Sequence, residues 1–326
     1  MPPMAPVEVY VGDELAAYGY EEKPWFRPDR LDAFLAELRG RGLDREVALV
    51  RAPPAADADI LRFHSAAHLE RVRRLCATDQ GALDHGPTFA RRSVEVAATH
   101  VVGAVMDAAR RLLAGEVRRA FVPIAGFHHA FAEAARNYCL YNDPAIALTF
   151  LLQEGIRPVA YVDVDVHHGD GVYAAFASEP DVVIVDIHED GRTLFPHSPE
   201  APGAGPVSGE RSWTGEGDAR GTKLNLPLRA GATDDDFRRA WDEAEVFLDG
   251  FRPAFIVFES GADGLLGDPL AHLRLTPGAL HDVAARVCAL ADRHAGGRLL
   301  VLGGGGYDKG NMARGWCGVV EALLGR

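Results

Sequence analysis

The sequence is poor in cysteine and has no long apolar run. Its four cysteines among 326 residues include no CxxC pair, which argues against a disulfide framework and against a cysteine zinc site. No apolar run approaches the ~18 to 20 residues that span a bilayer. The first residues contain neither a basic nor an apolar signal segment. We therefore expect a cytoplasmic protein without a membrane partner.

Basic side chains are also scarce relative to acidic ones. Lysine and arginine number 34 against 47 aspartates and glutamates, which gives a formal net charge of −13. A surface this acidic repels phosphate backbones, so nucleic acid is not an expected partner. It favours cationic ligands such as lysine-rich peptides or polyamines. An apolar share of 48% is that of a globular protein and excludes a disordered tail, a collagen-like fibre and a coiled coil.

Short apolar runs alternate with helical patterns from residue 45 onward. This alternation predicts a parallel sheet covered by helices on both faces, and we expect one domain over residues 1–326. The expected strands are residues 46–50, 120–124, 159–166, 182–187, 223–228, 254–260 and 298–305. The expected helices include residues 91–113, 143–153, 234–248, 277–291 and 312–324. The stretch 190–221, rich in glycine, proline and serine, predicts a surface loop beside the site.

The segment YVDVDVHHGDG, residues 161–171, joins an apolar strand to acids and histidines. Side chains alternate along a strand, so we expect Asp163, Asp165 and His167 to project from one face. Burying two carboxylates and an imidazole is costly unless a cation neutralises them. The carboxyl end of a strand is where open α/β sheets bind ligands. The segment therefore predicts a metal site rather than a set of solvated charges.

Two adjacent histidines, His128 and His129, directly follow another expected strand in the segment AGFHHA. Alone, they fit metal ligands, proton-transfer groups or exposed polar residues equally well. Asp163 and Asp170 favour proton transfer, because an imidazole base needs an acceptor on its other nitrogen. The sequence thus predicts two His–Asp dyads.

Two further segments follow strands at the same edge. ESGADGLLGDPL, residues 259–270, contains Asp263, which could complete an Asp–His–Asp site with the open fourth position of a catalytic zinc. Carboxylate-rich ligation also suits Fe(II) or Mn(II). LGGGGYDKG, residues 302–310, predicts a backbone that packs tightly against the site and presents the phenol of Tyr307. It matches neither the GxGxxG nor the GxxxxGK[ST] phosphate motif.

Together these residues resemble the arginase–deacetylase superfamily, specifically the zinc-dependent histone deacetylase family in its bacterial acetoin-utilization form. The matching motifs run in the family's order: RPDRL, FHHA, CLYND, YVDVDVHHGDG, IHEDGRTLFP, GADGLLGDPL and GGGGY. The resemblance implies a single three-layer αβα domain with an eight-stranded parallel sheet. It also implies hydrolytic removal of an acyl group, expected to be acetyl, from the ε-amine of lysine in proteins or peptides.

The resemblance assigns roles to the residues of the site. The implied zinc ligands, with Fe(II) as the alternative metal, are Asp165, His167 and Asp263. The implied catalytic residues are two tandem histidines, their carboxylate partners and a tyrosine that polarises the substrate carbonyl: His128, His129, Asp163, Asp170 and Tyr307. The implied shell of a structural potassium ion is Asp163, Asp165, His167, Asp186 and the carbonyl of Ile187.

The substrate-binding positions depart further from the family. They are Tyr138, Phe195, Asn137, Leu270, Asp84 and Arg30. The two aromatic residues match walls that enclose an extended lysine chain. Asp84, or its neighbour His85, matches a rim aspartate that grips the substrate backbone, and Arg30 matches an arginine at a channel for the acetate product. Asn137 stands where the family usually has glycine, and Asp186 where it usually has serine.

Other functions stay open. An amidohydrolase for acetylpolyamines or other small N-acyl amines suits the acidic composition. A non-catalytic binding protein is disfavoured because the catalytic set is complete, and an arginase-like enzyme with two manganese ions because one complete ligand set is visible. We expect a monomer or a small homo-oligomer, and we expect His64 and His68 to pack or cap a helix.

Overall fold

The computed structural model describes residues 7–196 and 209–326, which contain one eight-stranded sheet. The strands are β1 (Val7–Tyr10), β2 (Ala48–Val50), β3 (Arg119–Val122), β4 (Val159–Asp163), β5 (Val182–Glu189), β6 (Lys223–Leu228), β7 (Phe255–Glu259) and β8 (Leu299–Leu302). Neighbouring strands are all parallel, in the order β2-β1-β3-β8-β7-β4-β5-β6. The predicted eight-stranded parallel sheet is confirmed.

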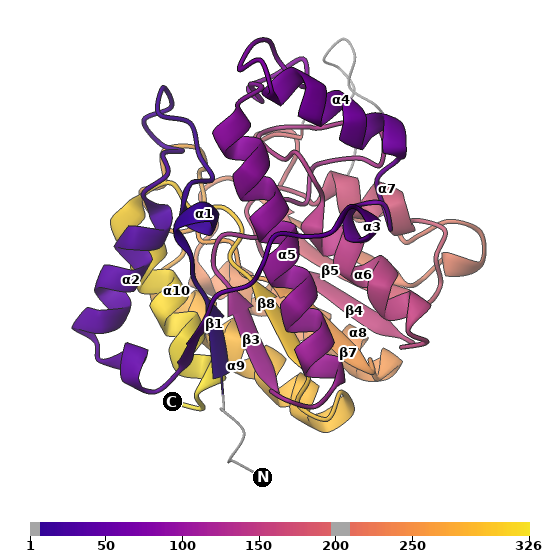
Figure 1. Ribbon diagram of the computed structural model, residues 1–326. Coiled ribbons are helices and arrows are strands. Elements are labelled where there is room, and N and C mark those ends of the chain that lie inside the picture. Colours follow the sequence, from indigo (N-terminus) through magenta and orange to yellow (C-terminus); the bar gives the residue numbers. More distant parts are fainter. Residues whose placement is uncertain (1–6, 197–208) are drawn as a thin grey trace.

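Helices cover both faces of this sheet. They are α1 (Asp13–Ala16), α2 (Arg30–Gly40), α3 (Asp57–Ile60), α4 (Ala66–Cys76), α5 (Arg92–Leu113), α6 (Asp143–Gln153), α7 (Asp170–Phe176), α8 (Asp234–Phe251), α9 (Pro277–His294) and α10 (Lys309–Leu323), with the 3₁₀ turns η1 (Leu43–Arg45) and η2 (Gly217–Ala219). Figure 1 shows α5 and α6 in front of the sheet and α8, α9 and α10 behind it. The predicted three-layer αβα arrangement is therefore confirmed.

Local sequence explains where several helices begin. Thr233 and Asp236 form a capping box at the start of α8, and three aspartates in its first turn face the positive end of the helix. Asn142 caps α6, because its side chain accepts the N–H of Ala145. These two helices begin where the sequence predicts.

The strand predicted over residues 159–166 ends earlier, at Asp163. Beyond that point side-chain oxygens accept two backbone N–H groups: Asp163 Oδ1 accepts the N–H of Asp165, and Asp165 Oδ1 accepts the N–H of His167, both at 2.9 Å. The predicted end of the strand is thus wrong by three residues, and the side chains of Asp163, Asp165 and His167 are all buried. The sequence pattern also misses β1, whose four residues are a short run. Part of the predicted loop 190–221, residues 197–208, lies outside the described residues.

The order of the strands brings the chemistry-bearing segments together. Strands β3, β8, β7 and β4 are successive neighbours in the middle of the sheet. The segment FHHA follows β3, GGGGY follows β8, GADG follows β7 and DVHHGDG follows β4. Because the strands are parallel, the four segments meet at one edge of the sheet. Within the described ranges, no helix has the length and apolarity to cross a membrane.

Candidate metal centre and active site

Three side chains form a compact Asp–His–Asp cluster at the carboxyl edge of the central strands. Asp165 and His167 follow β4, and Asp263 follows β7. His167 Nδ1 lies 3.1 Å from Asp165 Oδ1 and 3.1 Å from Asp263 Oδ2, and all three side chains are buried. Ligand atoms around a tetrahedral zinc ion with bonds of about 2.0 Å are about 3.3 Å apart. The spacing of the cluster therefore fits such an ion.

The donor set of the cluster also fits a cation. One imidazole nitrogen can carry one proton, yet two carboxylate oxygens face Nδ1 of His167 at equal distances. Burial opposes a charge on His167, but its hydrogen bonds with Asp165 and Asp263 outweigh burial and raise its pKa to about 10. The two buried carboxylates thus require positive charge, and a divalent ion bound by all three residues is suited to supply it.

Glycines let the backbone approach this cluster closely. The N–H of Gly305 donates to Asp165 Oδ2 at 2.6 Å, and a Cβ on Gly305 would lie 1.9 Å from Asp263 Oδ2. A Cβ on Gly261 would lie 2.4 Å from Asp165 Oδ2. The close packing predicted for the glycine run after β8 is confirmed.

Two His–Asp pairs lie beside the cluster. His128 Nδ1 donates to Asp163 Oδ2 at 2.8 Å, and His129 Nδ1 donates to Asp170 Oδ1 at 2.7 Å. The Nε2 atoms of the two histidines are 3.2 Å apart. Arg136, which the sequence pattern does not single out, lies 3.1 Å from the other oxygen of Asp170. Each carboxylate thus fixes the tautomer and orientation of one imidazole.

Burial and neighbouring charges make the two histidines different. Burial opposes protonation of His128, but Asp163 outweighs burial and raises the pKa of His128 well above its ordinary value. Burial and then the charge of His128 lower the pKa of His129 to about 4. This arrangement favours a cationic His128 beside a neutral His129.

Glu259 is a buried carboxylate to which the sequence pattern assigns no role. Tyr161 Oη donates to Asp163 Oδ2 at 2.7 Å and lies 3.1 Å from Glu259 Oε2. Glu259 also forms a group of close potential ligand atoms with His128 and Asp165. Its Oε1 lies 3.8 Å from His128 Nδ1, but that nitrogen already donates to Asp163. Burial and then the charge of Asp163 raise the pKa of Glu259 well above its ordinary value. We therefore interpret Glu259 as a protonated carboxyl beside His128 and not as part of a second metal site.

Tyr307 lines a small cavity together with both histidines, and the volume of this cavity is about 30 Å³. The N–H of Tyr307 donates to Asp268 Oδ2 at 2.8 Å, which fixes the backbone that carries the phenol. Burial and then the charge of Asp263 raise the pKa of Tyr307 well above its ordinary value. The phenol therefore stays protonated and can donate a hydrogen bond.

Arg30 lines the same cavity and is itself buried. Its Nε donates to the carbonyl of Gly306 at 3.1 Å and its Nη2 to that of Gly304 at 2.6 Å. The guanidinium carbon lies 5.7 Å from the centre of the Tyr307 ring. Arg30 thus holds the backbone of the glycine run. Its role at a channel for the acetate product stays a prediction.

The predicted substrate-binding residues lie in different places. Tyr138 and Asn137 line the cavity, whereas Phe195 and Leu270 are not part of its lining. The Phe195 ring packs against the His129 imidazole, with centroids 5.1 Å apart. The carboxylate of Asp84, also outside the lining, accepts four hydrogen bonds from the chain itself. A substrate amide would have to displace one of those donors.

The shell predicted for potassium is partly engaged within the protein. Asp186 Oδ1 accepts from His188 Nδ1 at 2.6 Å, and Asp186 Oδ2 accepts the N–H of Gly169 at 2.9 Å. The N–H of Asp165 occupies one oxygen of Asp163. Binding of potassium by this group, with the carbonyl of Ile187, stays a prediction.

Two residues at the start of α6 hold the loop that carries the tandem histidines, and the sequence pattern assigns them no role. Asn142 Nδ2 donates to two carbonyl oxygens of loop 126–130, at 3.1 and 2.8 Å. The Asp143 carboxylate accepts two backbone N–H groups of that loop, at 2.8 and 2.9 Å. The only signal for them in the sequence is their presence in the motif CLYND.

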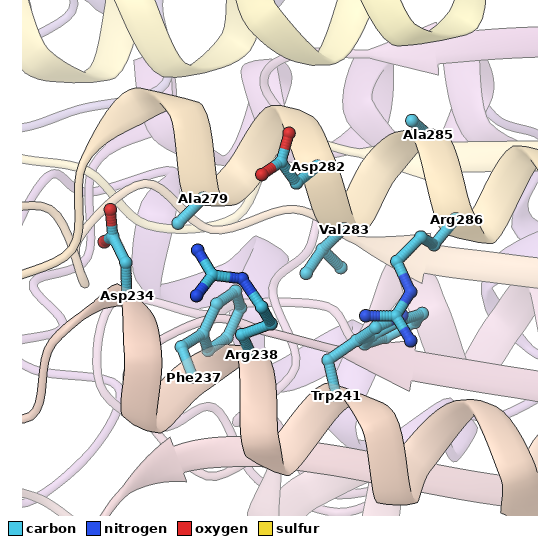
Figure 2. Close-up of a pocket in the computed structure, with 9 residues that line it drawn as sticks. All are labelled: Asp234, Phe237, Arg238, Trp241, Ala279, Asp282, Val283, Ala285 and Arg286. Carbon is cyan, nitrogen blue, oxygen red and sulfur yellow. The ribbon is translucent and has the colours of Figure 1, made fainter.

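A larger cavity of about 260 Å³ lies between α8 and α9, as Figure 2 shows. Its walls include Trp241, Arg238 and Arg286. Arg238 pairs with Asp235 on its own helix, and Arg286 pairs with acids of α8. Because these cations already have partners and no residue of the Asp–His–Asp cluster lines this cavity, it is separate from the candidate active site.

The fold and the site define a protein of the arginase/deacetylase class, and comparison with known proteins gives the family. The model of the histone deacetylase domain matches residues 24–323. The chain therefore belongs to the histone deacetylase family. A crystal structure of the HDA15 HD domain superposes with a TM-score of 0.88 at 25% identity, covering 98% of this chain and 88% of that one.

Bacterial relatives are similar along much of the chain. A histone deacetylase-like amidohydrolase of Pseudomonas aeruginosa is 35% identical over 315 residues, which cover 95% of this chain and 78% of that protein. The acetoin utilization protein AcuC of Bacillus subtilis is 36% identical over 223 residues, 68% of this chain and 54% of that protein. The predicted resemblance to the acetoin-utilization form of the family is confirmed.

Proposed function

We propose that this protein is a metal-dependent amidohydrolase that removes an acyl group, expected to be acetyl, from the ε-amine of lysine in proteins or peptides. The observation that carries this proposal is the buried Asp–His–Asp cluster beside two His–Asp pairs and a protonated Tyr307. A relative that is a histone deacetylase-like amidohydrolase supports the same reaction class.

Zinc is the metal we assign to Asp165, His167 and Asp263, with Fe(II) as the alternative. The spacing of the three ligand atoms and their burial support a tetrahedral ion with one open position. When bound, the metal would act as a Lewis acid on the acyl group and on water. Potassium at the Asp186 group remains part of the proposal and does not affect the assignment of zinc.

His129 is the proton acceptor and donor in this proposal. Its Nδ1–H is held by Asp170, so Nε2 carries the lone pair. Because its pKa is lowered to about 4, the imidazole is neutral near pH 7 and can take a proton from the attacking water. The same nitrogen then protonates the departing amine.

His128 and Tyr307 stabilise developing negative charge. His128 is held by Asp163 in the cationic form that the surrounding carboxylates favour. Tyr307 donates its phenolic hydrogen to the developing oxyanion, and deletion of one such donor costs about 2.7–4 kcal/mol in comparable sites. Tyr138 and Phe195 enclose the acyl-bearing chain. Arg30 contacts the carboxylic acid that is released by hydrolysis. The catalytic unit is proposed to be the single domain of residues 1–326.

The decisive experiment measures metal content and hydrolysis of an acetyl-lysine peptide by wild type, Asp263→Ala and Tyr307→Phe. Asp263→Ala should lose both zinc and activity, because one of three ligands is removed. Tyr307→Phe should keep zinc and lose about 100-fold or more in kcat. Tyr10→Phe, which removes a hydroxyl bound to Asp107 away from the cavity, is the matched control. Wild-type turnover in both site variants would disprove the proposal.

A second substrate class is an acetylated polyamine or another small N-acyl amine. The net charge of −13 favours a cationic amine, and the saturated carboxylate of Asp84 has no free acceptor for a peptide backbone. A panel of acyl-lysine peptides and acetylated amines separates the two classes. Strong preference for free amines over every peptide would reverse the ranking.

A further inference from the structure

The carboxylate of Asp84 is fully engaged within the protein. Asp84 Oδ1 accepts the N–H groups of Gly86 and Thr88, at 2.9 and 3.0 Å. Asp84 Oδ2 accepts the hydroxyl of Thr88 at 2.6 Å and the N–H of Asn137 at 2.8 Å. A carboxylate offers about four lone-pair sites. All of them have a donor before any substrate arrives.

Thr88 extends this network to the wall of the active-site cavity. Its side chain is fully buried. Its Oγ1 donates to Asp84 Oδ2 and accepts the N–H of Tyr138 at 2.7 Å. One hydroxyl group therefore links the Asp84 carboxylate to the backbone of a cavity-lining aromatic residue.

The backbone that Asp84 and Thr88 hold is a tight and strained turn. Arg136 and Cys139 exchange two backbone hydrogen bonds of 3.0 and 2.9 Å. Between them, Asn137 has φ 44° and Tyr138 has φ 68°, so both central residues are left-handed. Hairpin turns with two such residues favour Asn-Gly, and tyrosine at the second position is sterically unfavourable. The turn needs outside support, and the N–H groups of both central residues receive it from Asp84 and Thr88.

This turn places the Tyr138 ring in the wall of the cavity that contains the catalytic histidines and Tyr307. Tyr18 Oη donates to the carbonyl of Tyr138 at 2.8 Å, and the ring lies 4.9 Å from that of Phe26. The N–H groups of Asn137 and Tyr138, which donate to Asp84 and Thr88, hold the two peptide units before this carbonyl. A loss of either residue would let the turn relax and move the ring.

We propose that Asp84 is a positioning residue that acts through Thr88 on the Tyr138 wall, and that it does not grip the substrate backbone. This proposal rests on the proposed amidohydrolase function. The consequence is a specificity set by the cavity wall. An acyl chain is then recognised in the same way whether or not a peptide backbone is attached.

The test compares two substrates with the same acyl-bearing chain: an acetyl-lysine peptide and monoacetylated 1,5-diaminopentane, which lacks a backbone. Asp84→Asn and Thr88→Val should each lower kcat/KM by a similar factor, about tenfold, on both substrates. The double variant should be no worse than the poorer single variant. Thr88→Ser keeps the hydroxyl and should stay close to wild type, and zinc content should be unchanged in every variant.

Two results would overturn the proposal. The first is an Asp84→Asn variant that loses activity on the peptide alone while Thr88→Val retains it, because this is the behaviour of a gripping residue. The second is read without substrate, from urea unfolding of the four proteins of the Asp84→Asn, Thr88→Val cycle. The proposal requires that each single variant unfolds at a lower urea midpoint than wild type. It also requires that the loss of unfolding free energy in the double variant is smaller than the sum of the losses in the two single variants. Losses that simply add would overturn it. If wild type hydrolyses neither substrate, the proposed function fails, and the unfolding cycle still decides the role of Asp84.

Discussion

His64 shows at the scale of one residue how a buried polar side chain supports the site. Its Nδ1–H donates to the carbonyl of Ala132 at 3.2 Å, and its Nε2 accepts the N–H of Asn142 at 2.8 Å. Ser65 caps α4, and the buried His64 has the packing role, one of the two expected. The imidazole must be neutral, because Nε2 acts as an acceptor. Burial and then the nearby His68 lower its pKa to about 3.

This charge state predicts how stability depends on pH. Between pH 6.5 and about 3 the unfolded chain binds a proton at His64 that the native protein does not bind. The unfolded state therefore binds more protons, and the free energy of unfolding falls as the pH falls through this window, by up to about 1.4 kcal/mol per pH unit from this residue. Urea unfolding of wild type and His64→Gln between pH 6 and 4 should give a shallower pH dependence in the variant.

His281 provides the control for this measurement. Its pKa is raised, first by the hydrogen bond to the carbonyl of Arg326, so its contribution to stability changes above pH 6.5 and not below it. His281→Gln should leave the slope between pH 6 and 4 unchanged. An unchanged slope in His64→Gln would show that His64 is charged in the native protein.

At the scale of elements, the start of α6 serves as a clamp on loop 126–130, which carries the tandem histidines. Asn142 uses its oxygen to cap the helix, with Ala145 N–H at 2.9 Å, and its amide to hold two carbonyls of loop 126–130. Asp143 holds two N–H groups of the same loop. The cap of one element and the geometry of the neighbouring loop therefore depend on the same two side chains.

The two functions of Asn142 can be separated by substitution. Asn142→Asp keeps the capping oxygen but replaces the donor with an acceptor that faces two carbonyls. Loss of buried hydrogen bonds costs about 1–3 kcal/mol per unsatisfied group. We therefore expect kcat for the acetyl-lysine peptide to fall about 10-fold or more, with zinc content unchanged. Asn311→Asp, whose amide holds one carbonyl at the surface, is the control. Equal kcat in the two variants would contradict the clamp.

At the scale of the whole molecule, the fold buries several acidic side chains close together. Asp163, Asp165, Asp263 and Glu259 are all buried at the ends of the two neighbouring strands β4 and β7. Such a concentration of carboxylates is costly in a dry interior. A cation that bridges the segments after both strands would stabilise the junction and the fold around it.

Removal of metal should therefore lower thermal stability. We expect a chelator to reduce the Tm, and zinc added back at 100 times its Kd to raise the free energy of unfolding by about 2.7 kcal/mol. Scanning calorimetry of wild type with increasing zinc measures this. Asp263→Ala should show no increase with zinc. A wild-type Tm that is independent of both chelator and zinc would exclude a metal in the Asp–His–Asp cluster.

Sequence periodicity alone determined the alternation of strands and helices, because burial on both faces of a parallel sheet selects apolar strands, and caps such as Asn142 mark helix starts. Residue types alone also pointed to Asp165, His167 and Asp263, because acids and an imidazole at strand ends are too costly to bury without a partner.

Only the tertiary structure decided which of these groups meet. The strand order places β3, β8, β7 and β4 side by side, and no local pattern encodes that order. It also decided that the Asp84 carboxylate faces Thr88 and Asn137, and that Glu259 lies beside His128. Such contacts join residues far apart in the chain, and their partners are chosen by packing of the whole fold and not by the neighbouring sequence.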